Sequence, residues 1–260
     1  MWQRHWKLSS DPFTEGRRLF VTTPVHAEAV ARLIHAIETH QRRAHLQAPA
    51  GLGKSMVLAQ ALAQARAPHR RVALVSSPCD GPSLLADLAE GLGLRVQAGA
   101  SRAQAWRRLT DAVRVCHWQR LSVVLAIDDC QNLTDPSDRL DLARLVHLAP
   151  GSDARLTVIL SERSLDEPPS PAEWIVPIRL APLSRSEAER YLTAKMAAAG
   201  RGDPAFSPRA LARLHALSAG NPRGLDRLAT QSLMAGALRG VQIVSPEIVE
   251  DAAPECCAVG

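Results

Sequence analysis

A glycine-bearing segment between an expected strand and an expected helix constrains this chain more than any other feature. The segment Ala-Pro-Ala-Gly-Leu-Gly-Lys-Ser occupies residues 48–55, after a short strand at 44–47 and before a helix at 55–65. Its glycines, Gly51 and Gly53, let the backbone curl so that successive N–H groups point at a phosphate, and the following helix adds its positive N-terminal end. The segment predicts a phosphate-binding loop; a strand–helix turn with no ligand is the alternative.

The spacing A-x-x-x-x-G-K-S gives individual side chains of this loop a role. Lys54 is expected to reach the β- and γ-phosphates of a nucleotide, and the Ser55 hydroxyl to ligate Mg²⁺. Only three of the 31 Lys and Arg side chains are lysines, so a lysine at this position is not expected from composition alone and points to a specific role. Ala48 stands where the stricter motif has glycine, which is tolerable if its φ is negative. The residues expected to bind the nucleotide are Ala48, Pro49, Ala50, Gly51, Leu52, Gly53, Lys54, Ser55 and Met56.

The remaining pattern predicts an α/β fold with a parallel sheet that is covered by helices on both faces. Continuous apolar runs separated by helical segments are typical of such sheets, and the low aromatic content of 3% disfavours a β-sandwich. Strands are expected at 71–76, 121–128, 155–160 and 174–180, and helices at 82–92, 101–118 and 137–148. Only helices are expected afterwards, at 184–199, 207–219, 222–239 and from 246. The chain therefore divides into a core at 1–182, a helical lid at 183–253 and a flexible tail at 254–260.

Two carboxylates follow the most apolar of these strands. Asp128 and Asp129 end the run Val-Val-Leu-Ala-Ile, and in a parallel sheet this end faces the same crevice as the phosphate loop. Asp128 is expected to hold the Mg²⁺ shell and Asp129 to orient or deprotonate the attacking water, with Gln131 polarising the same region. A strand that simply ends in an Asp-rich turn is the alternative.

Two further residues could complete the site. Ser161 ends the next strand and could bind the γ-phosphate or the water, or equally cap the turn. Arg223 lies in the first turn of a helix opened by Gly-Asn-Pro, from which it could reach the phosphates and sense the nucleotide. A plain surface arginine is the alternative.

Charge and cysteine content exclude few functions. The net charge of +5 permits nucleic-acid binding but is too small to predict it. Arg107, Arg108 and Arg114 share one face of an expected helix, where a solvated surface is favoured over a nucleic-acid contact. The five cysteines have no zinc-site spacing and fit a reduced interior, and no apolar run is long enough to span a membrane. A cytoplasmic protein is expected.

With these residues the chain resembles the AAA+ ATPases, specifically the ExeA type (general secretion pathway protein A), which is related to transposition ATPases of the TniB and MuB kind. The resemblance covers nearly the whole chain and is carried by residues 5–13, 48–55, 127–133, 183–191, 206 and 220–223. It implies an αβα P-loop ATPase core with a C-terminal helical lid. It also implies that Pro12 and Phe13 lie near the adenine and that Arg223 is the second sensor arginine.

Three departures from that family shape the functional hypothesis. Asp129 replaces the catalytic glutamate, so hydrolysis is expected to be slow. Glu173 stands where the family has a Gln-Arg pair, so an intersubunit arginine would come from Arg163 or Arg179, or be absent. Longer secretion members continue after the lid into a membrane segment and a peptidoglycan-binding part, whereas this sequence ends there, so a secretion role is not expected.

The sequence thus predicts an ATPase that uses ATP and Mg²⁺ to drive a conformational or assembly change with an unidentified protein partner. DNA is a further candidate partner, and a homo-oligomer is a candidate state. Two alternatives remain open: a nucleotide-gated binding module with little turnover, and a DNA-loading adaptor of the transposition type.

Overall fold

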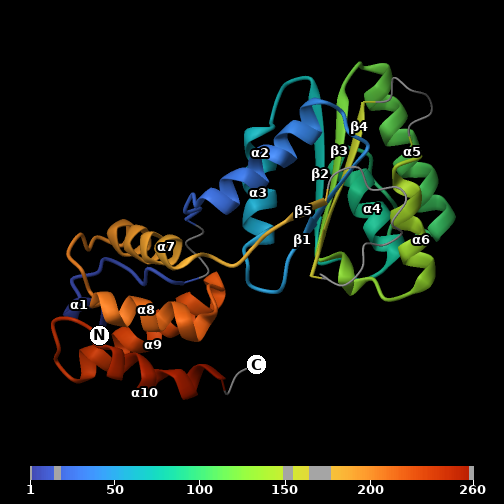
Figure 1. The fold of residues 1–260 in the computed structure, drawn as a ribbon. Coiled ribbons are helices and arrows are strands. Elements are labelled where there is room, and N and C mark those ends of the chain that lie inside the picture. The colour runs from blue at the N-terminus through green and yellow to red at the C-terminus, as the bar shows by residue number, and fades with distance from the viewer. Residues whose placement is uncertain (1, 15–18, 149–154, 164–176, 258–260) are drawn as a thin grey trace. The chain divides into compact units, whose positions relative to one another are not determined.

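The computed structural model describes residues 2–14, 19–148, 155–163 and 177–257, drawn in colour in Figure 1. Contacts divide the chain into two compact units. The sheet unit comprises Glu28–Ala50 and Lys54–Leu180, and the helical unit comprises Met1–Ala27, Gly51–Gly53 and Ala181–Gly260. The sequence had placed the first 27 residues and the loop tip with the sheet, whereas their contacts group them with the helices.

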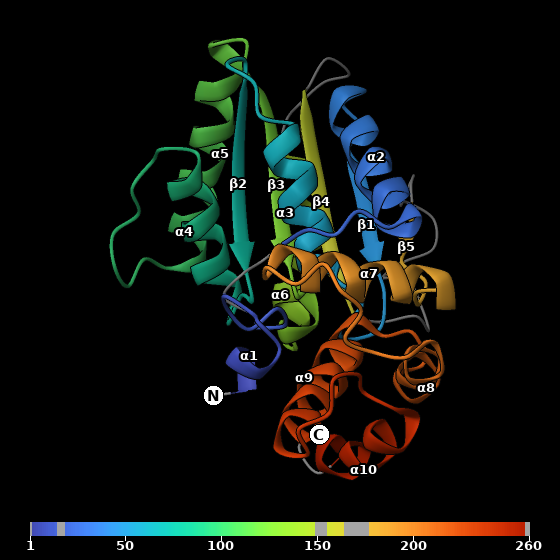
Figure 2. The ribbon, with the colours of Figure 1, turned by 90° about the vertical axis from the view of Figure 1, so that its left-hand side faces the viewer.

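The sheet unit contains five parallel strands in the order β2-β3-β4-β1-β5, which Figure 2 shows from the side of α2 and α3. Their bounds are β1 Arg43–Gln47, β2 Arg70–Ser76, β3 Ser122–Asp128, β4 Leu156–Glu162 and β5 Pro177–Arg179. Every residue of β1, β3 and β4 is buried, as expected for strands covered on both faces. The predicted parallel α/β fold is confirmed.

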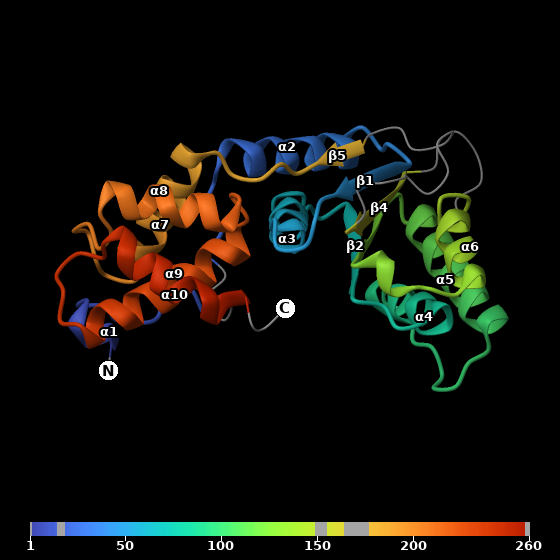
Figure 3. The same ribbon diagram turned by 60° about the horizontal axis from the view of Figure 1, so that its bottom comes forward.

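Helices cover both faces of this sheet. α2 (Pro24–Glu38) and α3 (Lys54–Gln64) lie on one face, and α4 (Gly81–Gly91), α5 (Arg102–Trp118) and α6 (Pro136–Leu145) lie on the other (Figures 1 and 3). The second group forms a continuous apolar core with one face of the sheet. A short 3₁₀ turn, η1 (Cys130–Asn132), follows β3.

α2 was not predicted from the sequence. Its buried apolar side chains are Ala29, Val30, Leu33, Ala36 and Ile37, at the i, i+1, i+4, i+7 and i+8 positions of a helix with one apolar face. That periodicity, together with proline at its first residue, was the available signal.

Short polar side chains fix where several helices begin. Asp80 accepts from the N–H of Ser83 at the start of α4, and Asp135 accepts from the N–H of Ser137 at the start of α6. Ser101 forms a reciprocal capping box with Gln104 at the start of α5. Each satisfies N–H groups that a helix leaves without internal partners.

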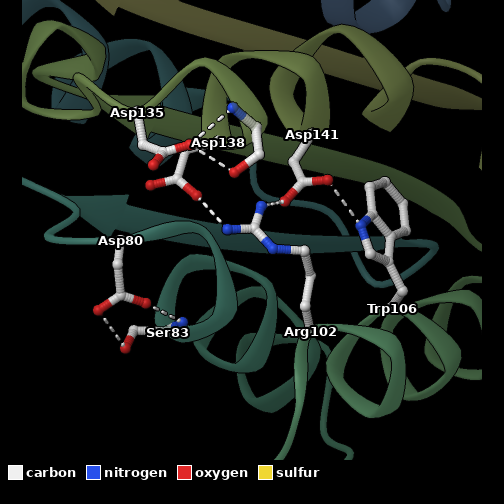
Figure 4. Close-up of polar contacts among 8 residues, drawn as sticks. Asp80, Ser83, Arg102, Trp106, Asp135, Asp138 and Asp141 are labelled. Carbon is white, nitrogen blue, oxygen red and sulfur yellow. Dashed lines mark hydrogen bonds and ion pairs between the residues drawn. The ribbon is translucent and has the colours of Figure 1, made fainter.

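An ion cluster ties α5 to α6, as Figure 4 shows. The Arg102 guanidinium donates to the buried carboxylates of Asp138, at 2.5 Å, and of Asp141. Trp106 Nε1 donates to the second oxygen of Asp141, at 2.9 Å. Hydrogen bonding to Asp138 raises the pKa of Arg102. Because both carboxylates are buried, Arg102 provides the positive charge that compensates them.

The helical unit packs five helices around a second apolar core. They are α1 Trp2–His5, α7 Arg185–Ala198, α8 Pro208–Ser218, α9 Pro222–Leu238 and α10 Pro246–Cys257. Ser184 and Glu187 form a reciprocal capping box at the start of α7. α10 continues through Pro254 to Cys257, beyond the expected end of the lid. Across the described segments, no helix combines the length and apolar character needed to cross a membrane.

Replacing Arg102 should destabilise the sheet unit. Arg102→Met keeps the apolar stem but leaves Asp138 and Asp141 without their cation. We expect the free energy of unfolding to fall by about 2–3 kcal/mol, below the range for a fully buried pair because Arg102 is partly exposed to water.

Urea unfolding followed by circular dichroism measures this change. Arg108→Met, on the exposed side of the same helix, is the control and should stay within about 0.5 kcal/mol of the parent. Equal stability of the two variants would contradict the structural role of Arg102.

Candidate functional site

The carboxyl edge of the sheet gathers the predicted catalytic residues of the sheet unit. β1, β3 and β4 are parallel, so Gln47, Asp128 and Glu162 end at the same edge. The first N–H after β1, that of Ala48, donates to the carbonyl of Glu162 at 3.3 Å. The start of the loop is therefore fixed to the neighbouring strand.

The loop has the backbone that its sequence predicts. Gly51 and Gly53 have φ values of 83° and 90°, a region that favours glycine, and Ala48 lies outside that region. Lys54 opens α3 with its side chain buried, and its Nζ donates to the carbonyls of Ala48 at 2.8 Å and Pro49 at 3.2 Å. The lysine thus folds back over the beginning of the loop, while Ser55 is exposed in the first turn of α3.

The tip of the loop, Gly51–Gly53, contacts the start of α9 within the helical unit. The Arg223 N–H lies 3.3 Å from the Gly51 carbonyl and also donates to Asn221 Oδ1 at 3.0 Å. Asn221 is the N-cap of α9, and a Cβ on Gly51 would lie 2.5 Å from its Oδ1. Glycine is therefore required at residue 51 by close approach as well as by its φ.

His26 supports the same tip and was not identified from the sequence. Its Nε2 donates to the Leu52 carbonyl at 3.0 Å, while Nδ1 pairs with the Thr23 hydroxyl at 2.8 Å. A Cβ on Gly53 would lie 3.1 Å from the same Nε2. Thr23 precedes α2 by one residue, so the signal would have been a Thr-x-x-His pair at a helix start.

The two carboxylates after β3 have different environments. Asp128 is buried, and its Oδ1 accepts from the N–H of Asp129 at 3.0 Å. Asp129 has the left-handed backbone, with φ 57° and ψ 44°, and is only partly buried. Asp and Asn adopt this region more readily than other residues with a Cβ.

The Asp129 carboxylate is held by neighbours on three segments. Gln131 Nε2 donates to Oδ1 at 2.8 Å, Ser77 Oγ donates to Oδ2 at 3.3 Å, and Arg163 Nε lies 3.7 Å from Oδ1. Gln131 Oε1 in turn accepts from the N–H of Arg163 at 3.1 Å. Gln131 therefore links β3 to the end of β4. Ser77, at the end of β2, was not identified from the sequence.

Ser161 lies inside β4, which continues to Glu162, and not at its end as expected. Its side chain is fully buried next to Leu46 in the register with β1. Its hydroxyl has no hydrogen-bond partner among the described residues, so no turn-capping bond is found. A buried hydroxyl without a partner is costly unless a ligand or water satisfies it.

Glu162 is a third carboxylate at this edge, and both of its oxygens have basic partners. Its Oε2 lies 3.4 Å from His45 Nε2, and its Oε1 lies 3.6 Å from the guanidinium of Arg139. The hydrogen bond with His45 and the charge of Arg139 lower the pKa of Glu162 despite its burial. Glu162 therefore stays ionised within the sheet unit, held by two partners.

The other predicted residues are placed as follows. Pro12 and Phe13 are buried, and Phe13 belongs to the core of the helical unit, with Lys195 Nζ 5.7 Å from its ring centroid. Their proximity to adenine stays a prediction. Glu173 lies outside the described residues, and Arg179 is exposed on β5.

The oxygen donors expected to hold Mg²⁺ are of the kind that this ion prefers. The described residues contain no group of three or more His, Cys, Asp or Glu side chains that could hold a metal ion. Mg²⁺ is typically bound through one or two protein oxygens together with substrate phosphates and water. Asp128 and Ser55 offer that kind of partial oxygen set.

Comparison with known proteins confirms the resemblance. The model of the family described as AAA domain matches residues 37–165. General secretion pathway protein A of Aeromonas hydrophila is 25% identical over 251 residues, which cover 92% of this chain and 46% of that protein. The chain thus spans less than half the length of this relative, and its residues 37–165 are similar to the AAA domain family.

Solved structures share the fold over nearly the whole chain. Cdc6p from Pyrobaculum aerophilum has a TM-score of 0.74 at 18% identity, covering 94% of this chain and 70% of its own. The Aeropyrum pernix ORC1 protein in complex with DNA has a TM-score of 0.72 at 18% identity, covering 94% and 68%. Drosophila ORC bound to DNA has a TM-score of 0.76 at 15% identity, covering 98% and 66%. At these identities the likeness shows a common fold.

Alanine at residue 51 should loosen the first turn of α9. Gly51 and Gly93 both have positive φ, 83° and 98°, so alanine strains both backbones. Only at Gly51 would the new Cβ meet Asn221, since nothing lies within 4 Å at Gly93. Hydrogen–deuterium exchange should therefore become faster at the start of α9 in Gly51→Ala and stay at the parent rate in Gly93→Ala. Equal exchange in both variants would show that the contact does not hold the turn.

Proposed function

From the similarity of residues 37–165 to the AAA domain family we propose that the chain binds ATP with Mg²⁺, hydrolyses it slowly, and uses this cycle to drive a conformational or assembly change with a partner. One observation carries the proposal. Two glycines with positive φ are followed directly by a buried lysine at the first residue of a helix. Such a loop directs backbone N–H groups and a positive side chain at phosphates.

Each residue of the loop has a proposed task. The backbone from Ala48 to Met56 binds the phosphates, and the Lys54 ammonium exchanges its two carbonyl contacts for β- and γ-phosphate oxygens. The Ser55 hydroxyl and the Asp128 carboxylate hold Mg²⁺, which would neutralise charge on the phosphate oxygens when bound. Pro12 and Phe13 are proposed to lie near the adenine.

Asp129 is proposed to orient the attacking water and accept its proton. A general base must reach the water within about 2.6–3.2 Å, directly or through one water. Aspartate is one methylene shorter than the family's glutamate, and both Asp129 oxygens already accept hydrogen bonds. Slow turnover follows, because misplacement on the order of 1 Å can cost about a hundredfold in rate.

Ser161 and Arg223 complete the proposed set. The Ser161 hydroxyl, buried and without a partner among the described side chains, is available for the γ-phosphate or the water. Arg223 is proposed to sense the nucleotide, since its N–H already contacts the loop at Gly51. The exposed Arg163 and Arg179 stay candidates for a contact with a second copy.

A second function from a different class is a nucleotide-gated binding module with negligible turnover. The hydrogen bonds that Asp129 accepts favour this binding module, because they hold the carboxylate of the expected base in place. A DNA-loading adaptor is a further form of this alternative, and two of the fold neighbours were solved with DNA. A steady-state phosphate-release assay separates the ATPase from either alternative.

Lys54→Ala should abolish ATP binding and leave the fold intact. The lysine contacts loop carbonyls, and its charge is the main cation expected at the phosphates. Lys7→Ala, at an exposed lysine, is the matched control and should bind as the parent does. Isothermal titration with ATP and Mg²⁺ measures both, and parent-like affinity of Lys54→Ala would overturn the assignment of the site.

Asp129→Asn should keep ATP binding and remove hydrolysis. Asparagine tolerates the left-handed backbone and keeps the size of the side chain, but it cannot accept a proton. Asp128→Asn should instead weaken the Mg²⁺-dependent binding itself. Single-turnover hydrolysis at saturating ATP compares these variants with the parent. If Asp129→Asn hydrolyses as fast as the parent, Asp129 is not the base.

A further inference from the structure

The edge of the sheet opposite the phosphate loop carries a concentration of positive charge. This entry edge consists of the described residues that lead into four strands, namely 38–43, 65–70, 118–122 and 155. In Figure 2 the strands enter the sheet from this edge at the top. Its bases are His40, Arg42, Arg43, Arg66, His69, Arg70, Arg120 and Arg155, and its one acid is Glu38.

Backbone hydrogen bonds hold the segments that lead into these four strands side by side. The Ser122 N–H donates to the His69 carbonyl at 2.9 Å, and the Val123 N–H donates to the Arg155 carbonyl at 2.7 Å. Between β4 and β1, the Val158 N–H donates to the Arg42 carbonyl at 3.0 Å. Neighbouring strands lie about 4.8 Å apart, so the basic residues that lead into β2, β3, β4 and β1 follow one another along this edge.

Their charges act on one another. Burial lowers the pKa of His40, and the positive charges of Arg155, Arg70 and His69 lower it further. Arg70, Arg120 and Arg155 form no ion pair with any acid that the structure describes, and the last two are exposed. On the basic face of α5, Arg114 lies 3.9 Å from the Asp111 carboxylate.

An exposed aromatic ring lies at the same edge. Trp118 ends α5 two residues before Arg120, and 89% of its surface is exposed. Tryptophan is rarely left so open, since a ring of this size contributes strongly when it is buried. Arg120 follows in the left-handed conformation, with φ 57°, which closes the turn from α5 into β3.

We propose that the entry edge binds a single-stranded nucleic acid, with its arginines on the phosphates and Trp118 stacked on a base. Proteins bind single-stranded nucleic acid by combining a row of cations with an exposed aromatic ring, because every base has a face on which such a ring can stack. Guanidinium groups suit phosphates because they donate paired hydrogen bonds in a planar fork. The surface lies at the opposite edge from the ATP site, so it is a second binding function.

A lipid surface offers the same phosphate chemistry and is the competing source. Peripheral membrane binding needs a broad apolar face as well as charge. Within the described part of the entry edge, Trp118 is the one large apolar side chain that is exposed, so little apolar surface would enter a bilayer. The structure therefore favours the nucleic acid.

The test uses fluorescence anisotropy with a labelled single-stranded oligonucleotide, a duplex of the same length, and vesicles containing phosphatidylserine. Arg120→Glu with Arg155→Glu removes two proposed phosphate contacts. Arg107→Glu with Arg108→Glu, on the outer face of α5, changes the net charge by the same amount at another place and is the control. All four side chains are exposed, so the fold should be retained. Trp118→Ala is compared with Leu238→Ala, an equally exposed side chain of the helical unit.

The edge pair should weaken single-strand binding about tenfold or more and reduce the salt slope by about 1.4, while the control pair stays close to the parent. Trp118→Ala should weaken single-strand binding about fivefold or more and leave the duplex unaffected, whereas Leu238→Ala changes neither. ATP binding should be unchanged in every variant, which separates this surface from the nucleotide site. Equal losses in the two arginine pairs, an unchanged Trp118→Ala, or edge-dependent binding of vesicles alone would overturn the proposal.

Discussion

The common direction of the five strands places the strand ends of β1, β3 and β4 at one edge and their beginnings at the other. β1 is the strand on which this arrangement depends most, since it pairs with β4 on one side and β5 on the other and is buried throughout. A strand fixed on both sides ends at a defined place, so Gln47 determines where the phosphate loop begins. The same pairing sets Ser161 beside Leu46 and joins the Ala48 N–H to the Glu162 carbonyl.

The tip of the loop is held by groups that belong to helix beginnings. The Gly51 carbonyl accepts from the first turn of α9, and the Leu52 carbonyl accepts from His26 near the start of α2. Both bonds use carbonyl groups of the loop and not its N–H groups. A movement of the first turn of α9 would change a hydrogen bond of the loop itself. This backbone contact gives residue 223 a physical link to the loop that does not depend on its guanidinium.

Much of the fold could be read from the sequence, because the strands are continuous apolar runs and the helices begin at polar caps such as Ser101 and Ser184. The two glycines and Lys54 could be predicted for the same reason: their spacing is local. Contacts between distant residues could not be predicted. Ser77 meets Asp129 across 52 residues, and only the register that sets Ser76 opposite Asp128 brings them together. The left-handed backbone of Asp129 has no local sequence signature beyond the residue type itself.

That backbone bears on why an aspartate stands where the resemblance to AAA+ ATPases implies a glutamate. Asp and Asn enter the left-handed region more readily than residues with longer side chains, so the turn into η1 favours the shorter carboxylate. In this turn Gln131 and Ser77 each donate to one Asp129 oxygen. In the proposed role of Asp129 as base, protonation would neutralise the carboxylate and weaken the hydrogen bonds it accepts, because a charged acceptor forms the stronger bond. A loss of about 1 kcal/mol corresponds to roughly fivefold in rate. If Asp129 is the base, as proposed, the hydrogen bonds of the turn would slow hydrolysis in addition to the effect of the missing methylene.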